Sequence, residues 1–283
     1  MHTNDTLQRF LFEHAAIRGE LIHLNQIYQT ISQQRRYPPR VQQLLGEALM
    51  TCALLVGGIK FEGDISLQFQ GDSRLPLILV QCNHLLHLRG FANFAENQSD
   101  ADYEDAFIHG SMVINITPHH QTQTYQSIVP LTTCSMSENL MHYFAQSEQI
   151  PSKVWFAVTD QHAAGIILQL MPGQNSQQRE QFWEYAVHIG QTITSEELLN
   201  LDNASFLHRL YHETELRLYP ERDLQFRCRC TPEKMQQVLT VLGAQEVQEL
   251  LQEKGKIDIS CEFCTMQYSF DPIDIAMLFR KQD

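Results

Sequence analysis

Hydrophobic residues recur every three or four positions between residues 38 and 58, which is the spacing of one face of an α-helix. Pro38 and Pro39 suit the start of this helix, and Gly57 and Gly58 suit its end. The spacing therefore predicts an amphipathic helix that packs one apolar stripe against the rest of its domain. The stripe consists of Val41, Leu44, Leu45, Ala48, Leu49, Cys52 and Leu55.

From residue 63 to residue 172 apolar positions alternate with polar ones, as they do in half-buried β-strands. In the segment 63–72, for example, Ile65, Leu67 and Phe69 are separated by polar residues. Because the connections are short, neighbouring strands are expected to pair antiparallel. The fold class predicted for residues 1–174 is thus α+β, a mostly antiparallel sheet with packed helices. The other strands are expected at 75–83, 87–94, 111–118, 124–131, 153–160 and 164–172, with a helix at 135–149.

Residues 175–226 differ in composition, with nine acidic and four basic residues among 52. Their helical segments are short. Ser195 is expected to cap one of them, and Phe206, Leu207 and Leu210 form the narrow apolar face of another. Helices this short have little stability unless they pack against a neighbour. We therefore predict a metastable helical linker.

Residues 227–283 are predicted to form a small separate module. Thr231 suits the N-cap of a helix, Pro232 its first position, and Gly255 the end of a second helix. A module of this size has a thin hydrophobic core and usually needs a disulfide or a metal for stability. The expected elements are helices at 232–243, 244–255 and 271–279 and a strand at 256–261.

Four of the seven cysteines lie in this module, within 37 residues, as Cys228 with Cys230 and Cys261 with Cys264. Zinc binds four thiolates tetrahedrally, and C-x-x-C and C-x-C turns can each direct two sulfurs at one ion. Zinc binding of this kind contributes roughly 10–16 kcal/mol to the folding of small modules. The spacing therefore predicts one Zn²⁺ per chain, held by all four cysteines, with no open position for hydrolytic chemistry.

Such a site is also sensitive to oxidants, because zinc holds each sulfur as the thiolate that oxidants attack. Oxidation would remove ligands, eject the metal and withdraw folding energy from the module. The short spacings make Cys228–Cys230 and Cys261–Cys264 the expected disulfides. A C-x-C disulfide is cramped, and strained disulfides have the higher potentials of regulatory bonds. We therefore predict a redox switch.

Other interpretations of the four cysteines remain open. In one alternative the four cysteines are unrelated buried thiols. Against it, Arg229 and Glu262 lie between the paired cysteines and favour exposed turns. A thioredoxin-like C-x-x-C motif is another, although Cys261 follows a strand that no βαβ unit surrounds. The corresponding alternative functions are a zinc-ribbon nucleic-acid-binding protein and a thiol–disulfide oxidoreductase.

Charge and motif content limit the partners. With 20 Lys and Arg against 33 Asp and Glu, the formal net charge is −13, so binding of a phosphate backbone would need a local basic patch. The pairs Arg35-Arg36 and Arg227/Arg229 are too short to form one. The sequence has no G-x-S-x-G motif, Walker loop or G-x-G-x-x-G motif, which disfavours an enzyme and a nucleotide partner.

The location is expected to be cytoplasmic, with no membrane partner. No apolar run approaches the ~20 residues that span a bilayer. The N-terminal residues lack the basic and apolar regions of a secretory signal. In the cytoplasm thiols stay reduced, which favours metal or redox roles for grouped cysteines over structural disulfides.

The remaining cysteines are not expected to form a site. Cys52 lies on the apolar stripe of a helix and Cys82 in an apolar strand, so both are expected to be buried and inert. Cys134 lies near a helix start, where a thiol pKa can fall, but no switch role is assigned to it.

Two pairs of histidines are likewise expected to be structural. His84 and His87 follow Cys82 closely, as metal ligands do, but alternate residues of a strand point to opposite faces. They are expected at a turn or on the surface. His119 and His120 are expected in a polar loop.

The chain resembles the redox-regulated bacterial holdases of the 33 kDa heat-shock protein family. The similarity runs along the whole sequence, and the C-x-C and C-x-x-C pairs are its most specific part. Other segments that resemble the family are KFEGDISLQFQGD, VINITP, YQSIVPL, HYFAQSEQIPSKVWF, RLYHETELRLY and FRCRC.

The resemblance implies a chaperone that holds unfolding client proteins without ATP. In the family, the reduced protein is a zinc-bound, largely inactive monomer. Oxidation forms the two disulfides, releases zinc and unfolds the zinc module and then the linker, so that apolar surface is exposed and dimers form. Under this resemblance, residues 1–174 bind clients and dimerise, 175–226 are the metastable linker, and 227–283 are the redox-switch domain.

One departure from the family concerns the residue after the C-x-x-C pair. Family members often have Gly or Asn there, because a positive φ suits the turn. This chain has Thr265, so the turn is expected to be less relaxed.

Overall fold

A computed structural model describes residues 4–119, 123–173 and 176–280, and it confirms the α+β fold class. Contacts along the chain divide it into two compact units, Met1–Phe226 and Arg227–Asp283. The segment 175–226 thus groups with the first unit, and all four cysteines of the predicted zinc site belong to the second.

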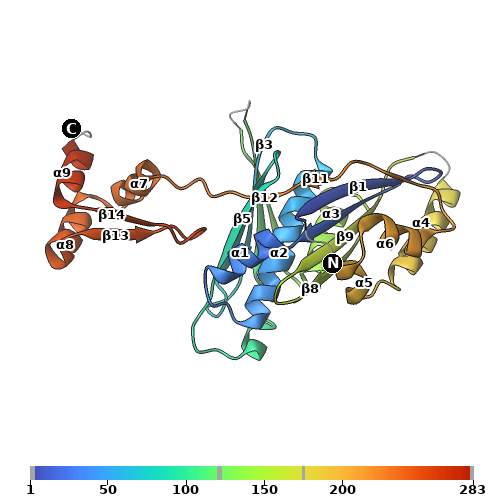
Figure 1. The fold of residues 1–283 in the computed structure, drawn as a ribbon, viewed down its shortest axis with the longest axis horizontal. Helices are drawn as coiled ribbons and strands as arrows, with labels where there is room; N and C mark the ends of the chain where they lie inside the picture. Colours follow the sequence, from blue (N-terminus) through green and yellow to red (C-terminus); the bar gives the residue numbers. More distant parts are fainter. Residues whose placement is uncertain (1–3, 120–122, 174–175, 281–283) are drawn as a thin grey trace. The chain divides into compact units, whose positions relative to one another are not determined.

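The first unit contains two sheets (Figure 1). The strands of the first, sheet A, are β1 (Thr6–Phe12), β2 (Ile17–Leu24), β8 (Ser152–Val158), β9 (Ala163–Leu170), β10 (Leu216–Leu218) and β11 (Arg222–Asp223). Their order is β10-β1-β2-β9-β8, and β11 also pairs with β1. All of these pairings are antiparallel.

The second sheet, sheet B, has the order β12-β5-β4-β3-β6-β7. Its strands are β3 (Gly63–Gln70), β4 (Leu77–Asn83), β5 (His87–Asn93), β6 (Ser111–Pro118), β7 (Tyr125–Pro130) and β12 (Gln225–Phe226). Five of them, β5-β4-β3-β6-β7, pair antiparallel, whereas β12 pairs parallel with β5. The strands predicted from alternation, from 63–72 to 164–172, are all confirmed to within two residues at each end.

Helix α2 (Pro39–Gly58) begins and ends as its prolines and glycines predict, and it contacts strands of both sheets. The prediction of a single apolar stripe is too narrow. Met50, Ala53 and Val56 lie off that stripe and are also buried, because sheets cover the helix on more than one side. By length and composition this helix is apolar enough to cross a membrane, contrary to the sequence-based expectation, but 78% of that window is buried inside the fold.

The sequence did not predict the elements before residue 38. These are β1, β2 and α1 (Gln26–Gln33). Strand β2 has apolar cores on both of its faces: Leu21 is buried in one core and the neighbouring Ile22 in the other. A strand buried on both faces does not alternate between apolar and polar residues, so its period is hidden. The remaining elements of this part are η1 (Asp100–Tyr103) and α3 (Met136–Gln146), the latter as predicted.

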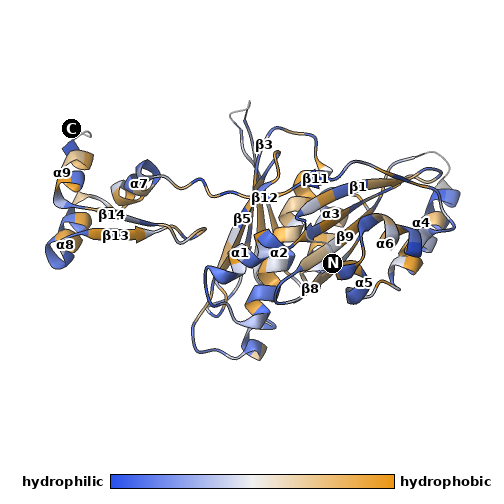
Figure 2. Ribbon diagram, in the orientation of Figure 1, coloured by the Kyte–Doolittle hydropathy of each residue, from blue (hydrophilic) through white to orange (hydrophobic). Residues whose placement is uncertain are grey.

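The segment 175–226 begins with three helices that cover the face of sheet A remote from α2. They are α4 (Ser176–Gly190), α5 (Ser195–Asn200) and α6 (Asn203–Tyr211). Figure 2 shows that these helices carry both hydrophobic and hydrophilic residues. Their apolar side chains join those of the sheet in a second core, whose buried members are Phe10, Phe12, Ile17, Leu21, Ala157, Ala164, Ile166, Leu168, Leu170, Ala186, Leu198, Phe206, Leu207, Leu210 and Tyr211.

Two predictions about this segment are corrected. The N-cap of α5 is Thr194, whose side chain and that of Glu197 form a capping box, and Ser195 is the first helical residue. The segment is also not helical throughout, because its last part pairs with β1 and β5 as β10, β11 and β12. A wholly helical linker was predicted because such two- and three-residue strands have no period of their own.

Polar contacts fasten the same segment to the sheets. The Gln8 side-chain amide donates to the carbonyl of Tyr219 at 2.8 Å, and Arg222 donates to the carbonyl of His84 at 3.0 Å. Exposed Arg217 forms two hydrogen bonds with the carboxylate of half-buried Glu13. Exposed ion pairs contribute little, so most of the attachment comes from the apolar core.

The second unit contains α7 (Pro232–Leu242), α8 (Ala244–Lys254), β13 (Ile257–Ser260), β14 (Gln267–Phe270) and α9 (Pro272–Arg280). As predicted, the Thr231 hydroxyl accepts a hydrogen bond from the amide of Lys234, and Gly255 ends α8 with a φ of 74°. Strand β14 was not predicted. The unit is held by a small core, whose buried members are Leu239, Val247, Ile257, Phe270 and Ile275.

Candidate metal centre

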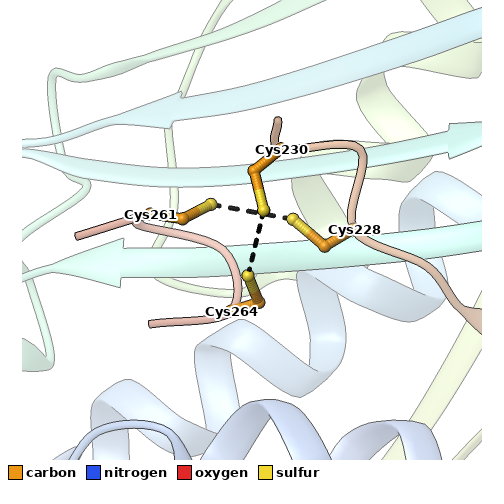
Figure 3. A group of neighbouring side chains, drawn as sticks. All are labelled: Cys228, Cys230, Cys261 and Cys264. Atoms are coloured by element: carbon orange, nitrogen blue, oxygen red, sulfur yellow. Dashed lines mark hydrogen bonds between the residues drawn. The ribbon is translucent and has the colours of Figure 1, made fainter. Parts of the chain in front are cut away.

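The side chains of the four cysteines point toward one another from two short segments, 228–230 and 261–264 (Figure 3). All four sulfur atoms lie within 4.8 Å of one another. Two of the sulfur–sulfur distances run between the segments, 3.6 Å from Cys228 to Cys261 and 3.4 Å from Cys230 to Cys264. Among the described residues, no other group of three or more histidine, cysteine or carboxylate side chains is gathered in this way.

Local structure explains how the two segments place their sulfurs. Cys230 immediately precedes Thr231, the N-cap of α7, so the start of that helix fixes the end of the C-x-C turn. Cys261 follows β13 directly. Its amide donates to the carbonyl of Met266 at 2.9 Å, and its carbonyl accepts from the amide of Thr265 at 2.8 Å. These bonds close the C-x-x-C turn between β13 and β14.

The electrostatics of the cluster favour one thiolate but not four. Burial opposes ionisation of Cys228, but hydrogen bonds from the Cys230 amide and from the other thiols lower its pKa to about 7. Burial, together with the neighbouring sulfurs, raises the pKa of Cys261 and that of Cys264. Because further thiolates repel the first, a bound cation is needed to hold all four sulfurs in the ionised form.

The donor set fits zinc. Soft thiolate ligands select zinc, Cu(I) or iron–sulfur clusters, and four of them around a single point suit a tetrahedral ion. Cys261 is buried, at 6% exposure, and the other three cysteines are half-buried. The four cysteines are thus partly, not fully, sheltered from solvent.

The structure adds Tyr268, which the sequence did not single out. It lies in β14 opposite Ile259, and its hydroxyl donates a hydrogen bond to the sulfur of Cys230 at 3.1 Å. This hydrogen bond is the main cause that raises the pKa of Tyr268 to about 12. Alternation along the segment 267–270 would have placed Tyr268 on one face of a strand. This is the sequence signal that could have identified the residue.

The turn after Cys264 is strained, as expected. Thr265 has a φ of 56°, in the left-handed region where a residue with a Cβ is disfavoured and a β-branched one more so. Its hydroxyl donates to the carbonyl of Cys264 at 2.8 Å. This conformation lowers the stability of the second unit, and of that unit alone, by about 1–3 kcal/mol.

We expect Thr265→Gly to stabilise the second unit by about 1 kcal/mol, because glycine adopts this φ freely, less the entropy that it adds to the unfolded chain. Hydrogen exchange of the amides in α7–α9 measures the change. Thr265→Ala, which removes the hydroxyl but keeps a Cβ, is the matched control and should give less protection than glycine. Equal protection in wild type and Thr265→Gly would show that the turn is not strained.

The other cysteines lie where the sequence predicts. Cys52 and Cys82 are both fully buried in the core around α2. Burial and the nearby Cys82 raise the pKa of Cys52 well above its ordinary value, which keeps it a thiol. Cys134 is exposed and precedes Ser135, the N-cap of α3.

The histidines do not gather around Cys82. His84 lies in the turn between β4 and β5, and His87 begins β5. The ring of His119 meets that of His84 edge to face, and its Nε2 lies 3.2 Å from a carboxylate oxygen of Asp64. His120 lies outside the described residues.

Comparisons with known proteins agree along the whole chain. The sequence model of the Hsp33 protein family matches residues 5–271. The 33 kDa chaperonin of Ectopseudomonas mendocina is 41% identical over 98% of this chain and 95% of the relative, and that of Shewanella woodyi is 39% identical over 98% and 96%.

A solved structure has the same fold. The crystal structure of the 33 kDa chaperonin of Thermotoga maritima superposes with a TM-score of 0.81, at 21% sequence identity, and covers all of both chains. Relatives of this similarity are named chaperonins, which is consistent with a protein that is not an enzyme. The chain belongs to the Hsp33 family of heat-shock chaperones.

Proposed function

We propose that this protein is a redox-regulated, ATP-independent holdase, which is activated when its four-cysteine centre is oxidised. The observation that carries the proposal is the convergence of Cys228, Cys230, Cys261 and Cys264, all within 4.8 Å in a unit with a small core. In the reduced form the four thiolates would hold one Zn²⁺, which supplies folding energy to residues 227–283.

Oxidation would proceed by thiolate chemistry. A sulfur attacks a peroxide oxygen to give a sulfenic acid and hydroxide, and the partner thiolate then displaces a second hydroxide to form the disulfide. Two electrons pass from the two sulfurs to the peroxide, and two protons from solvent convert both hydroxides to water. The proposed disulfides are Cys228–Cys230 and Cys261–Cys264, and each of them removes two ligands from the ion.

The consequence for the first unit follows from the chain path. We call the segment 176–226 the connector. Cys228 comes two residues after its last strand, β12, so loss of order in the second unit leaves the end of the connector next to unfolded chain. The connector consists of short helices and very short strands, which have little stability of their own. Its release would expose the apolar face of sheet A, including Phe10, Phe12 and Leu168.

That exposed face would bind unfolding client proteins and a second oxidised chain, so that the active form is a homodimer and the reduced form a monomer. Large exposed apolar patches are typical of such interactions. No nucleotide, nucleic acid or membrane is proposed as a partner. The proposed location is the cytoplasm, where the resting state of the thiols is reduced.

We expect the reduced, zinc-loaded chain to leave the aggregation of a thermally unfolding client nearly unchanged. After hydrogen peroxide at mildly elevated temperature, or hypochlorite, the same chain should suppress most of the light scattering without ATP. Zinc release, followed with a chromogenic chelator, should approach one ion per chain, and peptide mapping should identify the two proposed disulfides.

A Cys228→Ser, Cys261→Ser chain is the variant that lacks both proposed disulfides and half of the ligands. It should not retain zinc, and retention of one ion per chain would rule out the four-thiolate site. Equal suppression of aggregation by reduced and oxidised wild type would rule out the switch. Turnover of a dithiol substrate by the oxidised chain would instead favour an oxidoreductase.

A further inference from the structure

Tyr268 joins the two halves of the cysteine centre. It is four residues after Cys264, in the strand that continues the C-x-x-C turn, yet its hydroxyl reaches the sulfur of Cys230, 38 residues away in sequence. The oxygen–sulfur distance is 3.1 Å. Tyr268 is the only tyrosine between residues 227 and 283.

The position of the ring is fixed by the fold and not by the hydroxyl alone. Tyr268 pairs with Ile259 across the β13–β14 hairpin, and both side chains pack against the small core of the unit. A rigid ring on a paired strand therefore carries the donor to one sulfur only. Among the hydrogen bonds described for the centre, this is the contact in which a side-chain hydroxyl meets a cysteine sulfur.

We propose that Tyr268 is a positioning residue that restrains Cys230 and sets the rate at which the centre is oxidised. This inference rests on the proposed function of the centre as a zinc-thiolate switch. A hydrogen bond to a thiolate stabilises its lone pair and so lowers its reactivity toward an oxidant. Cys230 is thereby restrained in the reduced form.

The hydrogen bond from Tyr268 therefore adds to the activation barrier for oxidation of the centre. Formation of the Cys228–Cys230 disulfide requires the sulfur of Cys230 to leave the Tyr268 hydroxyl, whichever of the two sulfurs attacks the oxidant first. The electrons and protons are those of the disulfide reaction above, and Tyr268 supplies neither; it keeps its proton and loses only a hydrogen bond. In wild type this hydrogen bond must break before the transition state is reached, which slows oxidation. A chain without the hydroxyl should therefore be oxidised faster.

The test is Tyr268→Phe in the full-length, reduced, zinc-loaded chain. The ring and its packing stay, so one zinc per chain should be retained. The rate of zinc release under a fixed excess of hydrogen peroxide should rise roughly three- to tenfold, the effect of losing part of a charge-assisted hydrogen bond. With Co²⁺ in place of zinc, the sulfur-to-metal charge-transfer band should shift to lower energy while the tetrahedral ligand-field bands remain.

Ser269→Ala is the matched control. Ser269 is the next residue of β14, it is exposed, and its side chain bonds Asp258 on the neighbouring strand instead of a sulfur. It should leave both the release rate and the cobalt spectrum unchanged. If Tyr268→Phe also leaves both unchanged while wild type releases zinc, the inference is wrong and the proposed function stands. If wild type holds no zinc, the proposed function itself is wrong.

Discussion

Removal of zinc from the reduced chain is expected to unfold most of residues 227–280 and to leave α2 and strands β1–β9 folded. The hydrophobic core of the second unit has five buried members, whereas zinc binding by four thiolates contributes roughly 10–16 kcal/mol. That contribution is about as large as the whole free energy of unfolding of a typical domain. The unit is therefore expected to have no stable fold once the ligands are empty and reduced.

Hydrogen exchange measured by mass spectrometry in the presence of a chelator and a thiol-free reductant would test this. Amides of α7, α8 and α9 should exchange at nearly the rate of an unfolded chain, whereas those of α2 should remain protected as the internal control. Added zinc should restore protection. Persistent protection of α7–α9 in the metal-free chain would show that the small core suffices and that zinc is not the source of the stability.

The gathering of the four thiols could be predicted from the sequence because covalent spacing limits where they can lie. One residue separates Cys228 from Cys230 and two separate Cys261 from Cys264, so each pair must act together wherever the chain runs. The contact between Tyr268 and Cys230 has no such constraint. It depends on the register of β13 with β14, and β14 itself was not predicted.

Alternation located the strands of sheet B closely, and β9 was located although all of its residues are buried, whereas β2 was missed. The strands of sheet B alternate, with Ile65, Leu67 and Phe69 inward, and were located closely. Strand β2 is covered by α2 on one side and by the connector helices on the other, so it has no alternation to read. The short strands β10–β12 exist only because β1 and β5 offer free edges, which is information that their own sequence does not contain.

Substitution of Leu207 by aspartate is expected to make the reduced, zinc-loaded chain active without an oxidant. Leu207 lies in α6, is 1% exposed and packs in the core between the connector and sheet A. Loss of a buried leucine costs about 2–5 kcal/mol, and an unpaired buried carboxylate adds several more. A connector of three short helices cannot absorb that cost, so it should detach and expose the sheet.

The measurement is suppression of client aggregation by the reduced variant, together with its zinc content. Activity near that of oxidised wild type, with one zinc retained, would place the control of activity at the connector–sheet interface and downstream of the metal. His208→Asp is the matched control, because it adds the same carboxylate to the neighbouring, exposed position of α6 and should change the free energy of unfolding by less than about 0.5 kcal/mol. A zinc-loaded Leu207→Asp chain that remains inactive, although its α4–α6 amides exchange freely, would show that the face of sheet A is not the client-binding surface.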